Sequence, residues 1–304
     1  MRLELTSIKY FIPLLLISFN VSALELSDKV AACNAALNNG DLAAATKVAD
    51  EVLQQQNNHH EALLCKGRAL GAQGKFGEAL GALELATKSA QPGFDEIINH
   101  LLIGNLHKNN QNYAESIASY EKSLKVCEAD KNDKFKRMNL NLMGESQALS
   151  GDLNAALSSY LAGSKLANND NERADNFERL GATYSALGQH DKAIEYQLKG
   201  VLMQKKAGTL DEYANASLAL GKVYVLAKEY PNAEKTYTKL MQFAKENGGA
   251  YYEAKASYDL AQMKAASGDA SNAKAMMSDA LKLAKNIGDT GLATEIEASI
   301  KKLN

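Results

Sequence analysis

The sequence predicts an all-α protein built from a repeated pair of antiparallel helices. Two matching segments carry this prediction, because Leu180-Gly181-x-x-Tyr184 recurs 40 residues later as Leu220-Gly221-x-x-Tyr224. Small residues that return at a fixed interval beside apolar and aromatic ones are typical of repeated helical hairpins. The chain also has only 3 prolines in 304 residues, so helices can run with few interruptions.

The first segment predicts an export signal. Arg2 and Lys9 precede an apolar run from Tyr10 to Phe19, and Val21-Ser22-Ala23 supplies the small residues of a cleavage site. This pattern predicts a signal peptide over residues 1–23, cleaved after Ala23, and hence a periplasmic or secreted protein. An uncleaved anchor is the alternative, but the run is shorter than the roughly 20 apolar residues of a membrane span. We therefore expect no membrane insertion after cleavage.

Seven hairpins fit one register over residues 24–287, with starts near residues 26, 60, 97, 137, 174, 214 and 254. Position 8 of the repeat, in the first helix, holds nothing larger than cysteine: Cys33, Gly67, Gly104, Gly144, Gly181, Gly221 and Ala261. Position 20, in the second helix, is alanine or serine: Ala45, Ala79, Ser116, Ala156, Ala193, Ala233 and Ala273. Small side chains at both positions allow two helices to cross closely.

The turn between the two helices has its own signature. Position 15 is glycine in five repeats, and glycine can adopt the left-handed conformation that ends a helix; these are Gly40, Gly74, Gly151, Gly188 and Gly268, with Gln111 and Lys228 as exceptions. Asp41, Asp152 and Asp269 follow three of these glycines and can cap the next helix. Pro231 falls at the start of its second helix, where its missing N–H is tolerated.

Larger residues complete an apolar face on each hairpin. Position 24 carries most of them: Ala49, Leu83, Tyr120, Tyr160, Gln197, Tyr237 and Met277. One hairpin cannot bury such a face alone, so neighbouring hairpins must stack. Residues 288–304 then predict one more helix, whose apolar stripe of Ile296, Ile300 and Leu303 would cap the last repeat.

This register resembles the tetratricopeptide repeat (TPR) pattern over nearly all of the chain after residue 23, and the spacing of 37 to 40 residues is similar to the longer variety found in kinesin light chains. The resemblance implies a right-handed α-solenoid, with the first helices lining a concave groove. In TPR proteins positions 2, 5, 9 and 12 face that groove. Transferred to this chain, the partner-binding candidates are Asn34, Leu64, Arg68, Leu101, Asn105, Asn141, Glu145, Glu178, Lys222, Tyr258 and Gln262.

The chemistry of these candidates favours a protein partner. Polar side chains with leucine and tyrosine between them suit an extended peptide or a partner helix. The alternative interpretation is that the face is polar only because water fills the groove. The two-carboxylate clamp of chaperone-binding TPR domains requires lysine at position 5 beside asparagine at position 9. It is not expected here, because Val30 accompanies Asn34 and Leu101 accompanies Asn105.

Other classes of function find little support in the sequence. The formal net charge is -2 and no basic block exists, which disfavours nucleic-acid binding. No phosphate-binding loop or nucleophile motif is present, so we expect no enzyme and no cofactor. His100 and His107 occupy packing positions and no further ligand completes a set, so no metal site is expected. Cys33 and Cys65 would lie on neighbouring helices, where they can form a disulfide or act as buried thiols.

Three hypotheses follow for function. The first is an exported, non-enzymatic TPR scaffold or adaptor that binds protein partners in its groove, with a role in cell-envelope assembly by analogy only. The second is a structural homo-oligomer in contact through its cap or first repeat. The third is a small-ligand-binding or catalytic solenoid, which would require a deep pocket with converging polar groups.

Overall fold

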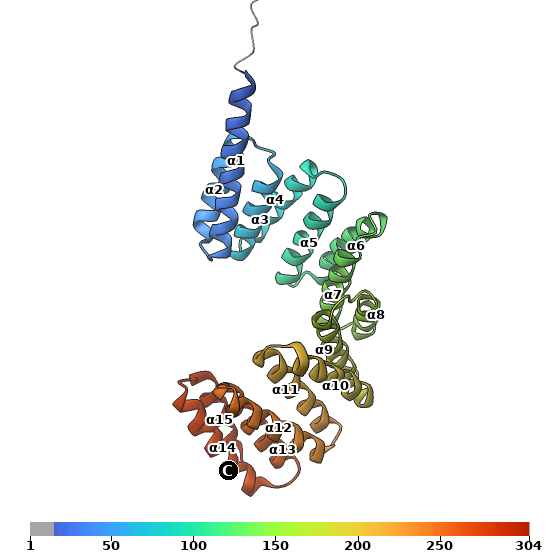
Figure 1. Cartoon of the computed structure of the whole chain (residues 1–304), viewed down its shortest axis with the longest axis vertical. Helices are drawn as coiled ribbons and strands as arrows, with labels where there is room; N and C mark the ends of the chain where they lie inside the picture. The colour runs from blue at the N-terminus through green and yellow to red at the C-terminus, as the bar shows by residue number, and fades with distance from the viewer. Residues whose placement is uncertain (1–14, 304) are drawn as a thin grey trace, which may run out of the picture. The chain divides into compact units, whose positions relative to one another are not determined.

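The fold is all-α, as the sequence predicts. The computed structural model describes the backbone of residues 15–303 and the side chains of residues 24–303. Over that part of the chain it contains fifteen α-helices and no β-strand, and consecutive helices pack as hairpins (Figure 1). The expected class, an α-solenoid of seven TPR-type hairpins with a C-terminal capping helix, is therefore confirmed.

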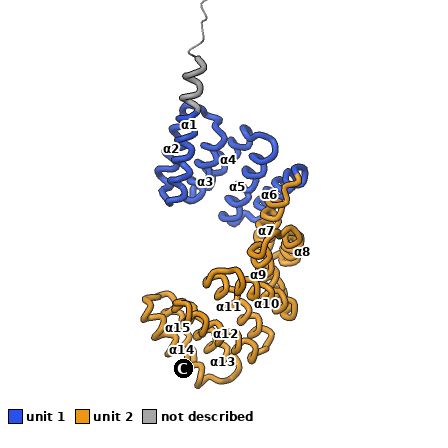
Figure 2. The backbone as a smooth tube through the Cα atoms, viewed as in Figure 1, with its two compact units in different colours: residues 1–130 blue, residues 131–304 orange. Residues whose placement is uncertain are grey.

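Two compact units divide the chain, and the boundary falls after Asp130 (Figure 2). Unit 1 holds the first three hairpins. Its helices are α1 (Leu15–Asn38), α2 (Leu42–Gln55), α3 (His60–Ala72), α4 (Phe76–Ser89), α5 (Phe94–Asn109) and α6 (Tyr113–Ala129). Residues 1–14 of the expected signal peptide lie outside the described residues, and residues 15–23 belong to the α1 backbone.

Unit 2 holds the other four hairpins and the final helix. Its helices are α7 (Asp133–Leu149), α8 (Leu153–Ser164), α9 (Asp170–Ala186), α10 (His190–Ala207), α11 (Leu210–Leu226), α12 (Tyr230–Glu246), α13 (Ala250–Ala266), α14 (Ala270–Asn286) and α15 (Thr290–Lys302). Each expected repeat start falls within an odd-numbered helix from α1 to α13, so the odd-numbered helices are the first helices of the hairpins. None of the described helices is both long and apolar enough to cross a bilayer.

Five of the seven hairpins, those of repeats two to six, are closed by a large side chain that packs on a backbone without a side chain. The residue at position 24 of the second helix lies on the position 8 glycine of the first. A Cβ added to Gly144 would come within 2.7 Å of the Tyr160 ring, and one added to Gly181 within 2.7 Å of Gln197. Real Cβ atoms essentially never approach so closely, so these positions accept only glycine without a local shift.

The turns use the backbone conformation that the glycines predict. Gly40, Gly74, Gly151, Gly188 and Gly268 all have positive φ, between +71° and +95°. The two exceptions, Gln111 and Lys228, adopt the same left-handed conformation, with φ of 62° and 60°. The register of the turn therefore persists where the residue type does not. The expected cap also forms, since the Asp152 carboxylate accepts a hydrogen bond of 2.9 Å from the backbone N–H of Ala155.

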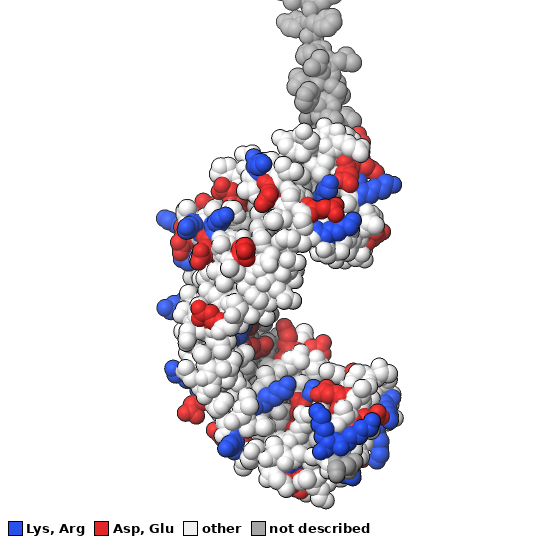
Figure 3. Space-filling model, turned by 180° about the vertical axis from the view of Figure 1, so that it is seen from behind, with Lys and Arg blue, Asp and Glu red and all other residues white. Residues whose placement is uncertain are grey.

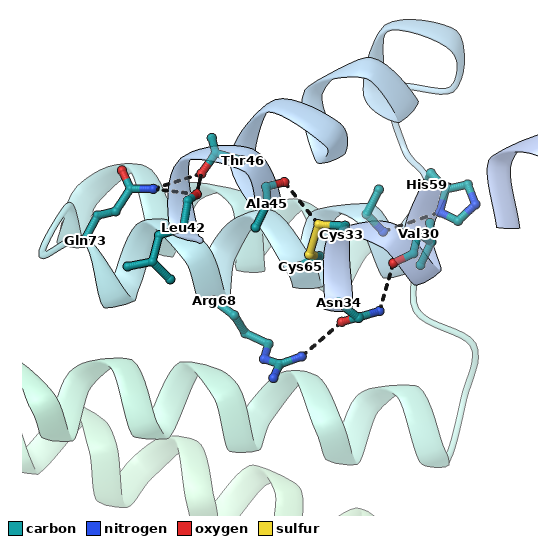
Figure 4. Close-up of a disulfide and its surroundings, with 11 residues drawn as sticks. Val30, Cys33, Asn34, Leu42, Ala45, Thr46, His59, Cys65, Arg68 and Gln73 are labelled. Carbon is teal, nitrogen blue, oxygen red and sulfur yellow. Dashed lines mark hydrogen bonds between the residues drawn. A yellow bond between two sulfur atoms is a disulfide. The ribbon is translucent and has the colours of Figure 1, made fainter. Parts of the chain in front are cut away.

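A disulfide joins the first two hairpins of unit 1. Cys33 in α1 and Cys65 in α3 are bonded, with their Cα atoms 6.4 Å apart, and both are buried (Figure 4). The question that the sequence leaves open is thus answered in favour of pairing. The carbonyl oxygen of Ala45 lies 3.1 Å from the Cys33 sulfur, where it would accept from the thiol if the bond were reduced. Cys127 in α6 is buried and is not part of a disulfide.

The packing predicts opposite effects for two glycine-to-alanine changes in helices. Gly221→Ala would drive a methyl group into the Tyr237 ring, whereas Gly81→Ala in α4 meets no atom within 4 Å. We expect Gly221→Ala to lower the free energy of unfolding by about 1–3 kcal/mol. We expect Gly81→Ala to raise it by up to about 1 kcal/mol, because alanine is the better helix former. Urea unfolding followed by circular dichroism measures both, and equal effects would contradict the packing model.

Candidate functional site

Exposure separates the candidate residues into two groups. Those at position 9 remain accessible to solvent: Arg68, Lys222 and Gln262 are exposed, and Asn34, Asn105 and Glu145 are half-buried. Those at position 5 lie deeper: Leu101, Asn141 and Tyr258 are buried, and Leu64 and Glu178 are half-buried. Side chains at position 9 are therefore accessible to a partner, whereas those at position 5 are mostly packed inside the array. A partner-binding role for these residues stays a prediction.

Neighbouring first helices explain the burial of position 5. In unit 2, the Asn141 side chain in α7 donates to the Asp175 carboxylate in α9 at 3.3 Å. The Tyr258 hydroxyl in α13 lies 2.6 Å from the Ser299 hydroxyl in α15. Each position 5 side chain in these pairs thus reaches the next odd-numbered helix and is covered by it.

Similar polar contacts hold the first helices of unit 1 together. Arg68 in α3 donates to the Asn34 side chain in α1 at 3.2 Å, close to the disulfide (Figure 4). His60 in α3 lies 3.2 Å from the Asn99 side-chain oxygen and 3.5 Å from the Asp95 carboxylate, both in α5. The structure thus brings two of the candidate residues, the exposed Arg68 and the half-buried Asn34, into direct contact, which the sequence did not predict.

An ion pair on the first helix of repeat five packs against the second helix of repeat four. Asp175 and Arg179 in α9 pair at 3.0 Å, and the Arg179 guanidinium lies 5.8 Å from the centre of the Tyr160 ring. Burial raises the pKa of the Tyr160 hydroxyl, although Arg179 acts to lower it. The tyrosine therefore remains protonated, and the arginine is held against its ring rather than extended into solvent.

The candidate residue Glu178, also in α9, lies where its negative charge is disfavoured. Burial raises its pKa, and the nearby carboxylates of Asp175 and Glu212 act in the same direction. Only the hydrogen bond of 3.1 Å that its side chain accepts from Gln204 opposes the shift substantially. Glu178 is thus a half-buried carboxylate whose ionised form is disfavoured by its surroundings.

One pocket opens on the first helices of unit 2, between α11 and α13. It has a volume of about 370 Å³, within the range of about 300–1,000 Å³ that is usual for ligand sites. Two of the candidates, Lys222 and Gln262, lie in its lining. The complete lining is Lys222, Val225, Leu226, Tyr237, Asp259, Gln262, Met263 and Ala266. We call this the repeat 6–7 pocket.

The repeat 6–7 pocket contains a buried carboxylate. Asp259 is 3% exposed, and the Lys255 ammonium contacts its Oδ1 at 2.5 Å. Its second oxygen, Oδ2, is buried and has no hydrogen-bond partner among the described residues. Burial raises the pKa of Asp259, while the bond from Lys255 acts to lower it. Burial also raises the pKa of the adjacent Tyr237 hydroxyl, so the tyrosine stays neutral.

The candidate Tyr258 is not part of the pocket lining, but it contacts Gln262, which is. Its hydroxyl accepts a hydrogen bond of 2.7 Å from the Gln262 side chain, and Lys255 lies 5.0 Å from the centre of its ring. Tyr258 is 1% exposed and cannot itself contact a partner in this conformation. It orients Gln262, which can.

Sequence reasoning missed Asp259, although a signal was present. Position 6 is apolar in five repeats: Ala31, Cys65, Leu102, Leu142 and Ala219. In the other two it is charged, as Arg179 and Asp259, and each pairs with the residue four positions earlier in its helix. A charge at a position that is otherwise apolar thus indicates an ion pair within the helix. The two pairs have opposite orientations, and only the pair of Lys255 and Asp259 is largely buried.

His100 and His107 of unit 1 are half-buried on the first helix of the third repeat, at the packing positions that the sequence predicts for them. The rings of His107 and Phe76 meet edge to face, with centroids 5.4 Å apart. Burial lowers the pKa of His100, and the neighbouring Lys122 lowers it further. Among the described residues, no three histidine, cysteine or acidic side chains group as a metal site requires.

Acidic and basic side chains are interspersed on the face that Figure 3 shows. No large area of one sign is visible there, in agreement with the nearly balanced composition and the net charge of -2. This face therefore gives little long-range electrostatic attraction to a strongly charged partner.

Comparison with known proteins supports this architecture. A family model described as a tetratricopeptide repeat matches residues 172–246, which span α9 to α12. A second model of the same description matches residues 99–130, which span most of α5 and all of α6. Tetratricopeptide repeats are therefore recognised in both units. No curated protein matches the chain.

Three solved structures share the fold at low sequence identity. The apo form of RapI has a TM-score of 0.70 and 12% identity, with 89% of this chain and 79% of that chain covered. The apo form of the quorum sensor NprR from B. thuringiensis has a TM-score of 0.64 and 16% identity, with 91% and 81% covered.

The third structure is a Signal Transduction ATPase with Numerous Domains (STAND) protein from Pyrococcus horikoshii, which has a tetratricopeptide repeat sensor. It has a TM-score of 0.66 and 15% identity, and 86% of this chain aligns with 41% of that longer one. At these identities the similarity defines the fold of this protein and nothing more specific. The class of protein is an all-α array of tetratricopeptide-type hairpins.

The raised pKa of Glu178 predicts that the stability difference between the wild type and a Glu178→Gln variant depends on pH. Its folded-state pKa is raised, so the stabilisation that protonation provides is complete only below the unfolded pKa and is lost as the pH rises through the folded pKa. Glu178→Gln should therefore be more stable than the wild type at pH 7, and the difference should shrink at pH 4. Urea unfolding at both pH values measures it. Glu121→Gln in α6, at an exposed position, is the control, and the same response from both variants would contradict the prediction.

Proposed function

We propose that this protein is an exported, non-enzymatic scaffold that binds a partner protein or extended peptide through the first helices of unit 2. The observation that carries the proposal is the repeat 6–7 pocket, which combines exposed polar side chains with an apolar interior. Leu226 at its edge is 57% exposed, although it belongs to a large apolar residue type. Such a combination is typical of a position that a partner side chain covers.

Several features support a binding role over catalysis. The carboxylate of Asp259 is paired with Lys255, so it is not a base poised beside a nucleophile. Repeated hairpins of this class usually bind through extended surfaces formed by several repeats. The pocket is also large enough for a small molecule. Experiments at this pocket must therefore distinguish a bound protein from a bound small ligand.

The disulfide supports export. Disulfides persist in oxidising compartments and are rare where glutathione and thioredoxin keep thiols reduced. Cys33 and Cys65 are paired in this structure, and the first 23 residues have the pattern of a cleaved signal. A role in assembling the cell envelope is the most specific form of this proposal, and identification of the partner would test it.

Photo-crosslinking can test the binding surface in cells that produce the protein. A photoreactive residue replaces Lys222 or Gln262 on the first helices, and Leu198 or Leu202 on α10 serves as the control pair, because both are exposed apolar residues of a second helix. We expect adducts with a second protein from the first pair only. Adducts with another copy of this chain would instead support the homo-oligomer. Equal adducts from both pairs, or none from the first, would contradict the proposal.

The redox state of the cysteines offers an independent test of export. Cys127 is buried, so thiols must be blocked in denaturant immediately on isolation from the native compartment. The protein should then carry one blocked cysteine, Cys127, and two that react only after reduction. Reduction should also lower the free energy of unfolding by about 3 kcal/mol, because the bond closes a long loop in the unfolded chain. Three blocked thiols in freshly isolated protein would argue against an oxidising compartment.

A further inference from the structure

The unsatisfied oxygen of Asp259 defines what the repeat 6–7 pocket lacks. Its Oδ1 is held by Lys255, but the buried Oδ2 accepts no hydrogen bond among the described residues. A buried acceptor without a donor is costly, so a ligand that brings a donor gains binding energy there. Because Oδ2 has less than 1 Å² of accessible surface, a side chain of the lining must move before a ligand reaches it. Met263 lines the same pocket, and its unbranched thioether side chain can make such a movement.

The charges around the pocket favour a neutral donor over a cation. The Lys255 ammonium already compensates Asp259, and the exposed Lys222 places a second ammonium in the lining. Glu295 of α15 lies near enough to raise the pKa of Asp259, but it is not part of the lining. A cation that entered would therefore be repelled by the ammonium groups of Lys255 and Lys222, and the carboxylate of Asp259 is already paired with Lys255. A neutral N–H or O–H group does not incur this repulsion.

The walls specify the body of the ligand. Val225, Leu226 and Met263 are apolar, and the Tyr237 ring adds an aromatic surface. An aromatic ring gains from burial against such walls and from contact with another ring. A ring that also carries one polar hydrogen matches both the walls and the free acceptor.

We propose that the repeat 6–7 pocket binds a tyrosine or tryptophan side chain of the partner, with the ring between Leu226 and Tyr237 and its O–H or N–H donated to Oδ2 of Asp259. This inference rests on the proposed function, since it names the residue type by which the partner is anchored. The exposed Lys222 and Gln262 then contact the partner backbone on either side. The Asp259 carboxylate, held in place by Lys255, selects for the donor.

The composition of the chain makes the test direct. The protein has no tryptophan, so the emission of an added indole reports its own environment. N-acetyl-tryptophanamide is the probe, titrated with the full mature chain. We expect saturable binding with a blue shift of the indole emission. In competition, N-acetyl-phenylalaninamide, which has a ring but no ring donor, should bind at least tenfold more weakly. Tryptamine, which adds a cation, should also bind more weakly.

Variants locate the binding. Leu226→Ala should weaken the probe severalfold, whereas Leu202→Ala, equally exposed but on α10, should leave it unchanged. Asp259→Asn should reduce the preference for tryptophan over phenylalanine to less than threefold, and circular dichroism verifies that each variant is folded. If Asp259→Asn does not fold, two results still test the proposal: the affinity of the tryptophan compound relative to the phenylalanine compound, and the effect of Leu226→Ala on binding of the probe.

Three results would overturn the inference: no binding of the probe at millimolar concentration, equal binding of the phenylalanine compound, or no effect of Leu226→Ala. None of these affects the crosslinking result at Lys222 and Gln262. A partner captured there without probe binding would leave the scaffold proposal standing and reject the aromatic anchor. Probe binding without any captured protein would favour a small-ligand site instead.

Discussion

The architecture depends on one recurring contact, in which a large side chain from the second helix of a hairpin packs on the bare backbone of the first. Tyr120, Tyr160 and Tyr237 each lie on the glycine at position 8 of their own repeat, and each ring is buried. The contact fixes how closely the helices approach and where they cross. Because dispersion and burial energies depend on close contact, a single added methyl group at this point is felt by the whole hairpin.

The same contact determines which residues can meet a partner. Once the hairpins stack, position 5 of the first helix can reach the next odd-numbered helix and be covered by it, as Asn141 and Tyr258 are. Position 9 stays at the surface, and beside it the position 24 ring of one repeat forms part of the repeat 6–7 pocket. Tyr237 thus closes its hairpin on Gly221 and also provides a wall for a ligand. Packing and recognition share one side chain.

The sequence predicts the fold well because its signals are local. Glycine at position 8 of five repeats and aspartate caps such as Asp152 in three report local backbone requirements that neighbouring residues reveal. The site was harder to predict, because exposure depends on the neighbouring hairpin: Leu101 belongs to the groove face by spacing, yet it is buried. The pairing of Asp259 with Lys255 four residues earlier in α13 could have been read from the sequence, but the pocket beside Asp259 arises only after the hairpins stack. Cysteine pairing also required the distance between two helices, which spacing alone does not give.

A double-mutant cycle at the glycine–tyrosine contact tests the central claim most directly. Gly221→Ala and Tyr237→Leu are made singly and together, and the free energy of unfolding is measured for all four proteins. If the ring rests on the bare backbone, the alanine costs much less once the ring is gone, and the two effects depart from additivity by more than about 1 kcal/mol. Effects that add within about 0.5 kcal/mol would show that the two residues are not in contact and would contradict the account.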